Sequence, residues 1–349
     1  MGYTLSLLDK SPLGSGETAT QALARSVELA RLAEQSGYHR YWVAEHHNSA
    51  HLACPSPEIL IAHILAHTTR IRVGSGGVML QHYSPYKVAE NFNLLAALAP
   101  GRVDLGVGKA PGGLPLSTRA LQAWQDPARK PPFDEQLAEL ARHLAAPAAD
   151  DSRDSPEGGG ASDESENAFG AVLRTTPQPP APAQPFLLGA SIASAELAAR
   201  LGWPLVYAAH INGAAAEVAR VLDHYRQLTG RPALLAVSAI VSEDAADAAQ
   251  LAARQQRFRV RVGDGQPVNV GSIEQAEAYV RQAGGGEYQI EQREAHVLHG
   301  RGADVVKALD ALHQRHGIEE FVIDQPLAEG AARLASVRLL AQAHRAAVV

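Results

Sequence analysis

The amino-acid sequence predicts an α/β fold, a (β/α)8 TIM barrel with insertions, formed by a single domain over residues 1–349. Strand-like and helix-like segments alternate along the chain, and eight strands are each followed by helical material, which is typical of such a barrel. The strands are continuous apolar runs with short connections, as expected for a parallel sheet covered by helices. A doubly wound open sheet is the alternative, because the sequence does not reveal the order of the strands.

In the first third of the chain, Gly, Pro and capping residues separate the apolar runs. Strands are expected at residues 3–8, 41–44, 71–80 and 103–109. Thr18 is a suitable N-cap for the helix before the second strand, and Gly37 ends that helix. Two further helices are expected, from Glu58 to His67 and from Lys87 to Ala99.

The same alternation resumes after an unusual middle segment. Residues 116–144 suit one or two helices, whereas residues 147–185 are rich in Pro, Gly, Ala, Ser and acids. Such a composition buries too little to offset the entropy of ordering, so it predicts a mobile insertion within the domain, with a domain linker as the alternative. Further strands are expected at 185–189, 205–208, 234–241 and 320–323, and helices at 191–201, 214–228, 245–262, 272–282, 303–316 and 330–346.

The composition restricts the class of protein. The 349 residues are 46% hydrophobic, enough for a large core, and the net charge of -6 includes no basic block of the kind that nucleic-acid binding needs. Cys54 is the single cysteine, so an internal disulfide is impossible and a reducing cytoplasm is expected. No apolar run has membrane-spanning length and the N-terminus lacks a signal-peptide pattern, so we expect a soluble cytoplasmic protein without membrane contact.

The most informative stretch is residues 41–47, an apolar strand that ends in Glu45, His46 and His47. Adjacent strand residues point to opposite sides, so only one of the two histidines should face the barrel mouth and act as a general acid or base. The alternative is that both are ordinary surface histidines. A metal site that adds His51 matches no standard ligand spacing, and no metal is expected.

Glycines gather in the third strand, at Gly74, Gly76 and Gly77. Glycine weakens a strand unless the backbone must approach something closely. A flat aromatic ligand lying on the strand would explain the glycines. The alternative is a bulge or tight packing between strands, and the residues alone favour that explanation.

A second group of polar residues suits an anion. Ser191 and Ser194 open a helix directly after a strand, where free amides and the helix dipole favour negative charge, and Lys109 ends the fourth strand. An ordinary serine cap and a solvated lysine are the alternative. Together the candidate residues indicate a planar cofactor with a phosphate group, and the missing Gly-x-Gly-x-x-Gly motif disfavours a classical dinucleotide fold.

Four ordered motifs resemble the bacterial luciferase-like monooxygenases, a family of flavin oxidoreductases. They are residues 7–12, 38–48, 71–80 and 101–108. The resemblance implies a (β/α)8 barrel that binds FMN, usually as a homodimer. It also implies that a separate NAD(P)H-dependent flavin reductase supplies the reduced FMN, which the enzyme uses with O2 to oxygenate a small organic substrate such as an aldehyde or another apolar compound.

The resemblance also implies roles for single residues. His46 is expected beside the flavin, as the catalytic residue that assists proton movement where flavin and oxygen react. Gly76-Gly77 matches a dipeptide that lies against the flavin ring, often with a non-proline cis bond, and Lys109 replaces a common arginine at the phosphate. The expected cofactor-binding residues are Glu45, Gly76, Gly77, Lys109, Ser191 and Ser194.

Three other functions stay open at this level. The barrel could bind flavin without catalysis, it could use a deazaflavin as an oxidoreductase, or its histidines could serve a metal-dependent hydrolase. Residues 262–290 correspond to a region where relatives carry a mobile lid, and they contain several glycines that would permit motion. The sequence diverges there, so it does not identify the substrate.

Overall fold

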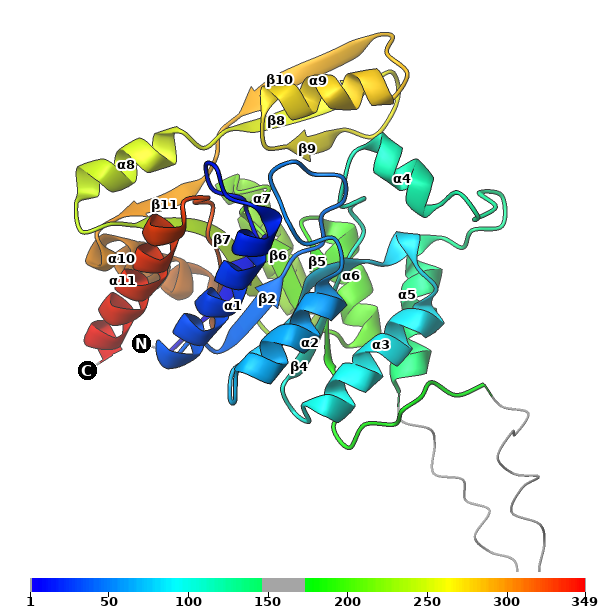
Figure 1. The fold of residues 1–349 in the computed structure, drawn as a ribbon, viewed down its shortest axis with the longest axis horizontal. Coiled ribbons are helices and arrows are strands. Elements are labelled where there is room, and N and C mark those ends of the chain that lie inside the picture. Colours follow the sequence, from blue (N-terminus) through cyan, green and yellow to red (C-terminus); the bar gives the residue numbers. More distant parts are fainter. Residues whose placement is uncertain (1, 146–172, 349) are drawn as a thin grey trace, which may run out of the picture.

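Eight parallel strands close into a barrel in the computed structural model, which describes residues 2–145 and 173–348 (Figure 1). Neighbouring strands pair in chain order, and the last barrel strand pairs with both the first and the seventh, which closes the ring. The expected barrel is therefore confirmed, and the open sheet is excluded. The barrel strands are β1 Thr4–Asp9, β2 Arg40–Val43, β3 Arg72–Met79, β4 Val103–Gly108, β5 Gln184–Gly189, β6 Leu205–Ala208, β7 Leu234–Val241 and β12 Glu320–Asp324.

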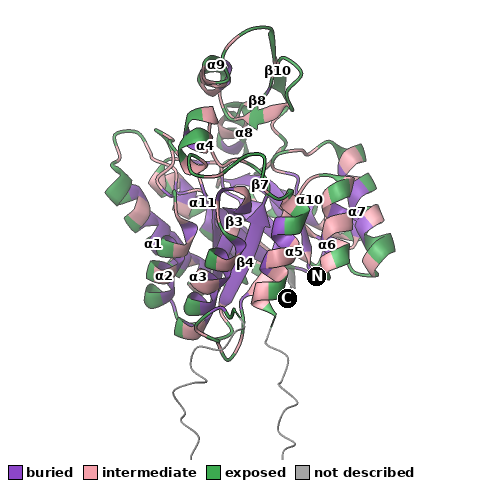
Figure 2. Ribbon diagram, turned by 90° about the vertical axis from the view of Figure 1, so that its right-hand side faces the viewer, coloured by how far each residue is buried: buried purple, intermediate pink, exposed green. Residues whose placement is uncertain are grey.

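Helices form an outer layer around these strands, and Figure 2 shows the buried sheet behind them. The Thr18 cap is confirmed as part of a capping box, because Gln21 N donates to Thr18 Oγ1 at 3.3 Å and Thr18 N donates to Gln21 Oε1 at 2.9 Å. The outer helices are α1 Ala19–Gln35, α2 Pro57–His67, α3 Pro85–Leu98, α5 Phe133–Leu144, α6 Ile192–Leu201, α7 Ala215–Thr229, α10 Gly302–His316 and α11 Gly330–Val348. Two short helices, η1 Leu80–His82 and α4 Pro115–Leu121, follow β3 and β4.

The barrel strands are buried on both faces, which explains their continuous apolar runs. One set of side chains packs outward against the helices, and the alternate set fills the barrel interior. The interior set consists of Leu8, Trp42, Ala44, Phe186, Val206, Ala236 and Val322. The Trp42 and Phe186 rings meet edge to face at a centroid distance of 5.0 Å, so this layer blocks the middle of the barrel.

A charged cluster closes the barrel at the N-terminal ends of its strands. Asp104 is fully buried and accepts from Arg40 Nη1 and Trp42 Nε1, both at 3.0 Å, and from Arg72 Nε at 2.9 Å. Arg40 Nε also donates to Glu320 Oε1 at 2.7 Å. Because these charged groups pair with one another, this cluster has a structural role and closes this end of the barrel. Polar groups that could bind a ligand lie at the opposite end.

Two helices, an antiparallel sheet and one further strand are inserted between β7 and β12. The helices are α8 Ala245–Ala253 and α9 Ile273–Gln282, the sheet consists of β8 Arg257–Val262, β9 Val268–Val270 and β10 Tyr288–Arg293, and the further strand is β11 Val297–Gly300. The expected helix over 245–262 is wrong beyond Ala253, because residues 257–262 form β8. Phe258 and Val260 alternate with arginines and pack on Ala276 and Val280 of α9, so this contact selects the strand.

The insert, residues 245–300, lies over the C-terminal ends of the barrel strands, at the top of Figure 1. On one side, β11 lies beside the C-terminal half of β7 and pairs with it in parallel, from Ser238 to Val241. On the other side, Gln282 at the end of α9 binds α4, because Leu116 N donates to Gln282 Oε1 and Arg119 Nη1 donates to Gln282 O, both at 3.0 Å. The insert therefore spans the barrel mouth.

The expected mobile insertion at 147–185 lies for the most part outside the described residues, since 146–172 are not described. Within the described remainder, Thr175 packs on the barrel helices. Thr175 is buried, accepts from Asn93 Nδ2 at 3.1 Å and donates to His143 O at 3.0 Å. Among the helices of the described ranges, none has the length and apolarity needed to cross a membrane.

Candidate active site

Polar side chains replace the apolar interior at the C-terminal ends of the barrel strands. Each follows an inward-facing core residue by two or four positions, so the two-residue period of the strand directs it into the barrel. The members of this polar layer are Lys10, His46, His210, Ser238 and Asp324. Because parallel strands end at one edge, five separate chain segments contribute to a single site.

Asp324 is the fixed centre of the polar layer. It is fully buried, its Oδ1 lies 2.7 Å from Lys10 Nζ, and its Oδ2 accepts from Ser238 Oγ at 2.7 Å. Burial alone would raise the pKa of Asp324, but the charge of Lys10 and these hydrogen bonds hold it below its ordinary value. Burial lowers the pKa of Lys10, and Asp324 opposes that shift. The pair leaves little net charge at this point.

Two imidazoles of the polar layer are prepared to bind something other than protein. The Nδ1 atoms of His46 and His210 are buried, and neither has a hydrogen-bond partner among the described residues. Burial, followed by the charge of Lys10, lowers the pKa of His46 to about 4. Burial likewise lowers the pKa of His210 to about 4, although Asp324 acts in the opposite direction. Both rings are therefore neutral near pH 7, and each nitrogen can donate or accept one hydrogen bond.

His47 points away from the barrel interior, as the strand period predicts. Its Nε2 lies 2.6 Å from Glu45 Oε1, and Glu45 also accepts from Tyr83 OH at 2.8 Å and from Met79 N at 3.0 Å. The Glu45 carboxylate thus ties β2 to the end of β3, and its role at a cofactor stays a prediction. Among the described residues, no three His, Cys, Asp or Glu side chains converge as metal ligands.

The Gly76-Gly77 peptide bond is cis, and a β-bulge interrupts the pairing of β3 with β4 at this point. A Cβ at Gly76 would lie 2.6 Å from Leu8 Cδ1, and a Cβ at Gly77 would lie 2.7 Å from Gly106 O. Close packing and the bulge therefore account for both glycines without a ligand. Gly76 is nevertheless partly exposed in a strand that is otherwise buried after its first residue, so the backbone is accessible there.

The serine pair lies at the start of α6, two strands further along the barrel. Ser191 caps the helix, since Ser194 N donates to Ser191 Oγ at 3.2 Å, and the two hydroxyl oxygens are 2.9 Å apart. Gly189 permits this arrangement, because a Cβ there would overlap the Ser194 side chain. The exposed Lys109 directly follows β4, the strand that pairs with β5 up to Val107 and Leu187. A helix N-terminus and two hydroxyls thus lie together after β5, and a cation follows the neighbouring strand.

All the residues singled out from the sequence lie at one end of the barrel, in three neighbouring positions. His46 lies in the polar layer, Gly76-Gly77 on β3, and Lys109 with the serine pair at β4 and β5. The sequence reasoning missed Lys10, Ser238 and Asp324 as site residues. Their signal was the continued two-residue period beyond the apolar core.

Comparisons with known proteins agree with this architecture. The chain matches the family described as luciferase-like monooxygenase over residues 4–319. The N-acetyl-S-alkylcysteine monooxygenase of Bacillus subtilis (strain 168) is 42% identical over 348 residues, which cover 98% of each chain. Among solved structures, apo-MsnO8 is 32% identical with a TM-score of 0.73 and 98% of each chain covered.

A more distant solved structure contains FMN. The oxygenating constituent of 3,6-diketocamphane monooxygenase from the CAM plasmid of Pseudomonas putida, solved in complex with FMN, has a TM-score of 0.66 at 17% identity. It covers 98% of this chain and 97% of its own, and at that identity it shows the fold alone. The family match and the extended identity to the Bacillus enzyme show that this chain belongs to the luciferase-like monooxygenases.

Proposed function

We propose that the protein uses reduced FMN and O2 to insert one oxygen atom into a small N-acylated thioether that carries a carboxylate. The observation that carries the proposal is the buried Nδ1 atom of His46, which has no hydrogen-bond partner among the described residues. It lies in the polar layer at the barrel mouth, after the strand that pairs with β3 and its partly exposed Gly76. Reduced FMN would supply the electrons that O2 needs, so that one oxygen atom enters the substrate and the other leaves as water.

The residues present fit FMN at its phosphate end. The first amides of α6, the hydroxyls of Ser191 and Ser194, and the ammonium of Lys109 offer donors and positive charge to one phosphate. Lysine provides a point charge where arginine would provide a two-pronged contact, so we expect Lys109→Arg to bind FMN at least as tightly. The partly exposed Gly76 offers the flavin ring a surface without a side chain.

His46 would manage protons beside that ring. Its pKa of about 4 keeps the imidazole neutral at physiological pH, so Nδ1 can accept a proton or a hydrogen bond from the reacting groups. The Glu45–His47–Tyr83 network lies behind it and fixes the backbone between β2 and β3. We therefore expect His46→Asn to lower kcat strongly, whereas Tyr83→Phe should act mainly on stability.

The substrate class follows from the nature of the mouth and from the name of the relative. A cavity of about 350 Å³ adjoins the polar layer and is lined by Lys10, His210 and Arg257 among other polar residues. Such a lining suits an anionic compound better than the apolar aldehyde that the resemblance suggested. The Bacillus relative is described as acting on N-acetyl-S-alkylcysteines, which combine a thioether with a carboxylate, and we extend that substrate class to this chain.

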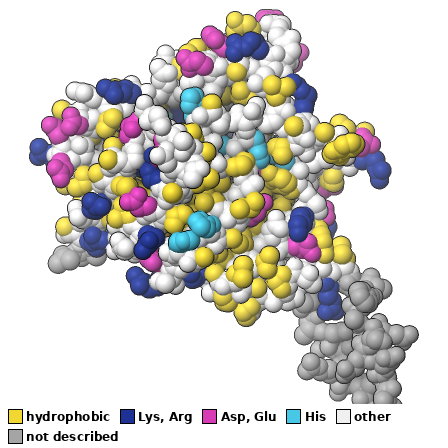
Figure 3. Space-filling model, viewed as in Figure 1, with side chains coloured by type: hydrophobic (Ala, Val, Ile, Leu, Met, Phe, Trp, Pro, Cys, Tyr) yellow, Lys and Arg dark blue, Asp and Glu magenta, His cyan; other side chains and the backbone are white. Residues whose placement is uncertain are grey.

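The proposal includes two protein partners. A separate NAD(P)H-dependent flavin reductase would supply reduced FMN, and a second copy of the chain would cover an apolar face. Ile59 on α2 and Leu94 and Leu98 on α3 are 70%, 51% and 68% exposed, and hydrophobic side chains gather over these helices in Figure 3. Leu98→Glu should therefore lower the molar mass of the particle measured by light scattering from that of a dimer to that of a monomer.

A coupled assay tests the proposed activity. The protein is mixed with FMN, a flavin reductase, NADH, O2 and N-acetyl-S-butylcysteine, and loss of the thioether is followed by chromatography. We expect turnover that stops without FMN or reductase and that falls at least about a hundredfold in His46→Asn. NADH consumption that yields only hydrogen peroxide, with the thioether intact, would refute the proposal. Parallel titrations with FMN and a deazaflavin test the choice of cofactor, and tight FMN binding without turnover would favour a non-catalytic flavin protein.

A further inference from the structure

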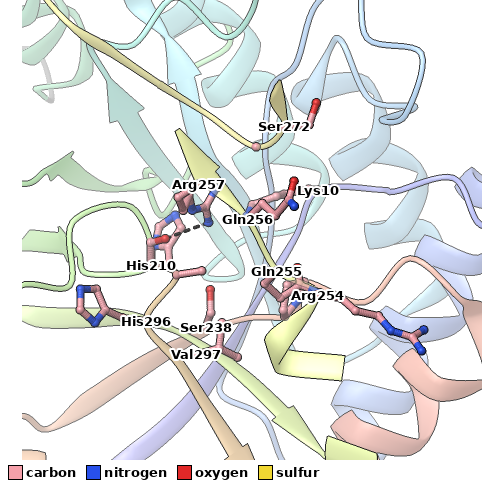
Figure 4. Close-up of a pocket in the computed structure, with 13 residues that line it drawn as sticks. Lys10, His210, Ser238, Arg254, Gln255, Gln256, Arg257, Ser272, His296 and Val297 are labelled. Carbon is pink, nitrogen blue, oxygen red and sulfur yellow. Dashed lines mark hydrogen bonds between the residues drawn. The ribbon is translucent and has the colours of Figure 1, made fainter. Parts of the chain in front are cut away.

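The cavity above the polar layer has an unusual charge. Lys10, His210 and Ser238 of the barrel form one wall, and the segment that leads into β8 forms the other, including Arg257. Figure 4 shows Lys10, Arg257 and His210 among the residues that line this cavity. The lining includes cations, imidazoles and amides but no carboxylate. A site of this composition attracts an anion.

Arg257 is one of two arginines in the lining, with Arg254, that form no ion pair among the described residues. The buried Asp324 neutralises Lys10 across 2.7 Å, whereas the Arg257 guanidinium has no carboxylate within ion-pair distance among the described residues. Among the described residues, its side chain makes one hydrogen bond, which Nη2 donates to His210 O at 2.9 Å. This hydrogen bond orients the side chain over the barrel rim, and no other described residue takes up its remaining donors. His210 also lines the cavity, and its buried Nδ1 has no hydrogen-bond partner among the described residues.

We propose that Arg257 is the specificity-determining residue that binds the carboxylate of the substrate, with Lys10 as its neighbour on the barrel rim. This inference rests on the proposed function and deepens it by assigning the anionic end of the substrate to the insert. A guanidinium matches a carboxylate with two parallel hydrogen bonds, so it fixes orientation as well as charge. The thioether then extends from this anchor toward His46, which shares the polar layer with Lys10 and His210.

The strand that carries Arg257 supports the assignment independently. Phe258 and Val260 face α9, so the alternating Arg257, Arg259 and Arg261 lie on the opposite face of β8. Arg259 and Arg261 are exposed. This row of cations ends at the cavity, where it would raise the local concentration of an anionic substrate.

The test compares two arginines on the same strand and face. Arg257→Gln removes the proposed anchor, and Arg261→Gln removes an equal charge about 13 Å further along β8. Calorimetry measures the binding of N-acetyl-S-butylcysteine, and of its carboxamide, to each variant in the presence of oxidised FMN. For the acid, we expect Kd to rise about tenfold to hundredfold in Arg257→Gln and less than twofold in Arg261→Gln. For the carboxamide, both variants should bind as the wild type does, and Arg257→Lys should recover part of the loss.

The outcomes separate this inference from the proposed function. Thermal unfolding first confirms that each variant keeps the fold. Three results would show that Arg257 is not the carboxylate anchor, even where the coupled assay shows turnover. The wild type could bind the acid and the carboxamide equally, or bind neither. Arg257→Gln and Arg261→Gln could also weaken the binding of the acid equally. If the predicted binding pattern appears without any turnover, the anchor stands and the proposed monooxygenase activity fails.

Discussion

The barrel and the insert differ in how much buried packing stabilises them. Barrel strands are buried on both faces between an apolar interior and a layer of helices, and a buried charge cluster closes one end. The insert has a core of four buried side chains, Phe258, Val260, Ala276 and Val280, and the edge strand β10 of its antiparallel sheet is largely exposed. A core of this size contributes little stability by itself.

This difference in packing suggests that the two regions have different functions. The barrel holds the polar layer and the expected flavin contacts on a rigid frame, which suits a reaction that needs fixed geometry. The insert reaches over the mouth, carries Arg257 and is held to α4 through Gln282. Weakly packed elements over a site are the ones that open and close most easily. The predictions below test whether the two regions are independent in stability.

The largest effect is expected where the barrel strands meet the last helix. Arg333 on α11 and Asp9 at the end of β1 are each 1% exposed, and Arg333 Nη2 donates to Asp9 Oδ1 at 2.7 Å. Arg333→Met leaves the Asp9 carboxylate buried without its counter-charge, so chemical denaturation should show a loss of about 3–5 kcal/mol in the free energy of unfolding.

Arg338→Met is the matched control, because Arg338 lies on the same helix and is exposed. It should change the free energy of unfolding by no more than about 0.5 kcal/mol. The double variant Asp9→Asn, Arg333→Met should recover part of the loss. Equal losses in Arg333→Met and Arg338→Met would contradict the buried ion pair.

The second effect concerns pH. The pKa of His46 is about 4 in the folded protein and 6.5 ordinarily, so the unfolded chain binds the extra proton first as the pH falls. The stabilisation from the neutral ring is complete above pH 6.5 and is lost as the pH falls toward 4, by about 3 kcal/mol. Denaturation at several pH values should show a smaller acid loss in His46→Asn than in the wild type. At pH 8 the free energies of unfolding of the two proteins should differ only by the pH-independent effect of the substitution. If the two plots of this free energy against pH ran parallel from pH 8 to pH 4, they would contradict this origin of the loss.

The smallest global effect is expected in the insert. Phe258→Ala should speed hydrogen exchange at the amides of β8 and β10, while the free energy of unfolding of the barrel changes by less than about 1 kcal/mol. The matched barrel substitution is Phe321→Ala in β12, which removes a fully buried ring and should cost about 3–5 kcal/mol globally. If Phe258→Ala destabilised the whole protein as much as Phe321→Ala, the two regions would form one cooperative unit.

The same contrast explains what could be predicted from sequence. The eight barrel strands are apolar runs bounded by Gly, Pro or charges, and each was located because double-sided burial leaves that signature. In the insert, the alanine-rich helix α8 is followed by Arg254, Gln255 and Gln256, which are good helix formers, so propensity favoured a longer helix. The contact with α9, which no local pattern reveals, ends that helix and selects β8.

The site divides in a similar way. The pair His46 and His47 was noticed because a strand that ends in titratable groups is conspicuous, and the strand period predicted that only one of them faces the barrel mouth. The choice of His46 came from the family resemblance. Asp324 was missed because the last strand was ended one residue too early, and Ser238 because it stands within an apolar run. Arg257 could not be assigned, since its place depends on how the insert folds back over the barrel. The roles of Glu45, Gly76, Gly77, Lys109, Ser191 and Ser194 at the cofactor stay predictions, as do the reductase, the dimer and the cytoplasmic location.

Isotope labelling tests the central claim most directly. The coupled reaction with N-acetyl-S-butylcysteine is run under ¹⁸O2 in ordinary water, and the product is analysed by mass spectrometry. The account predicts one ¹⁸O atom per product molecule, with formation that requires FMN and that fails in His46→Asn. A product that takes its oxygen from water, or that forms equally in the His46 variant, would contradict it.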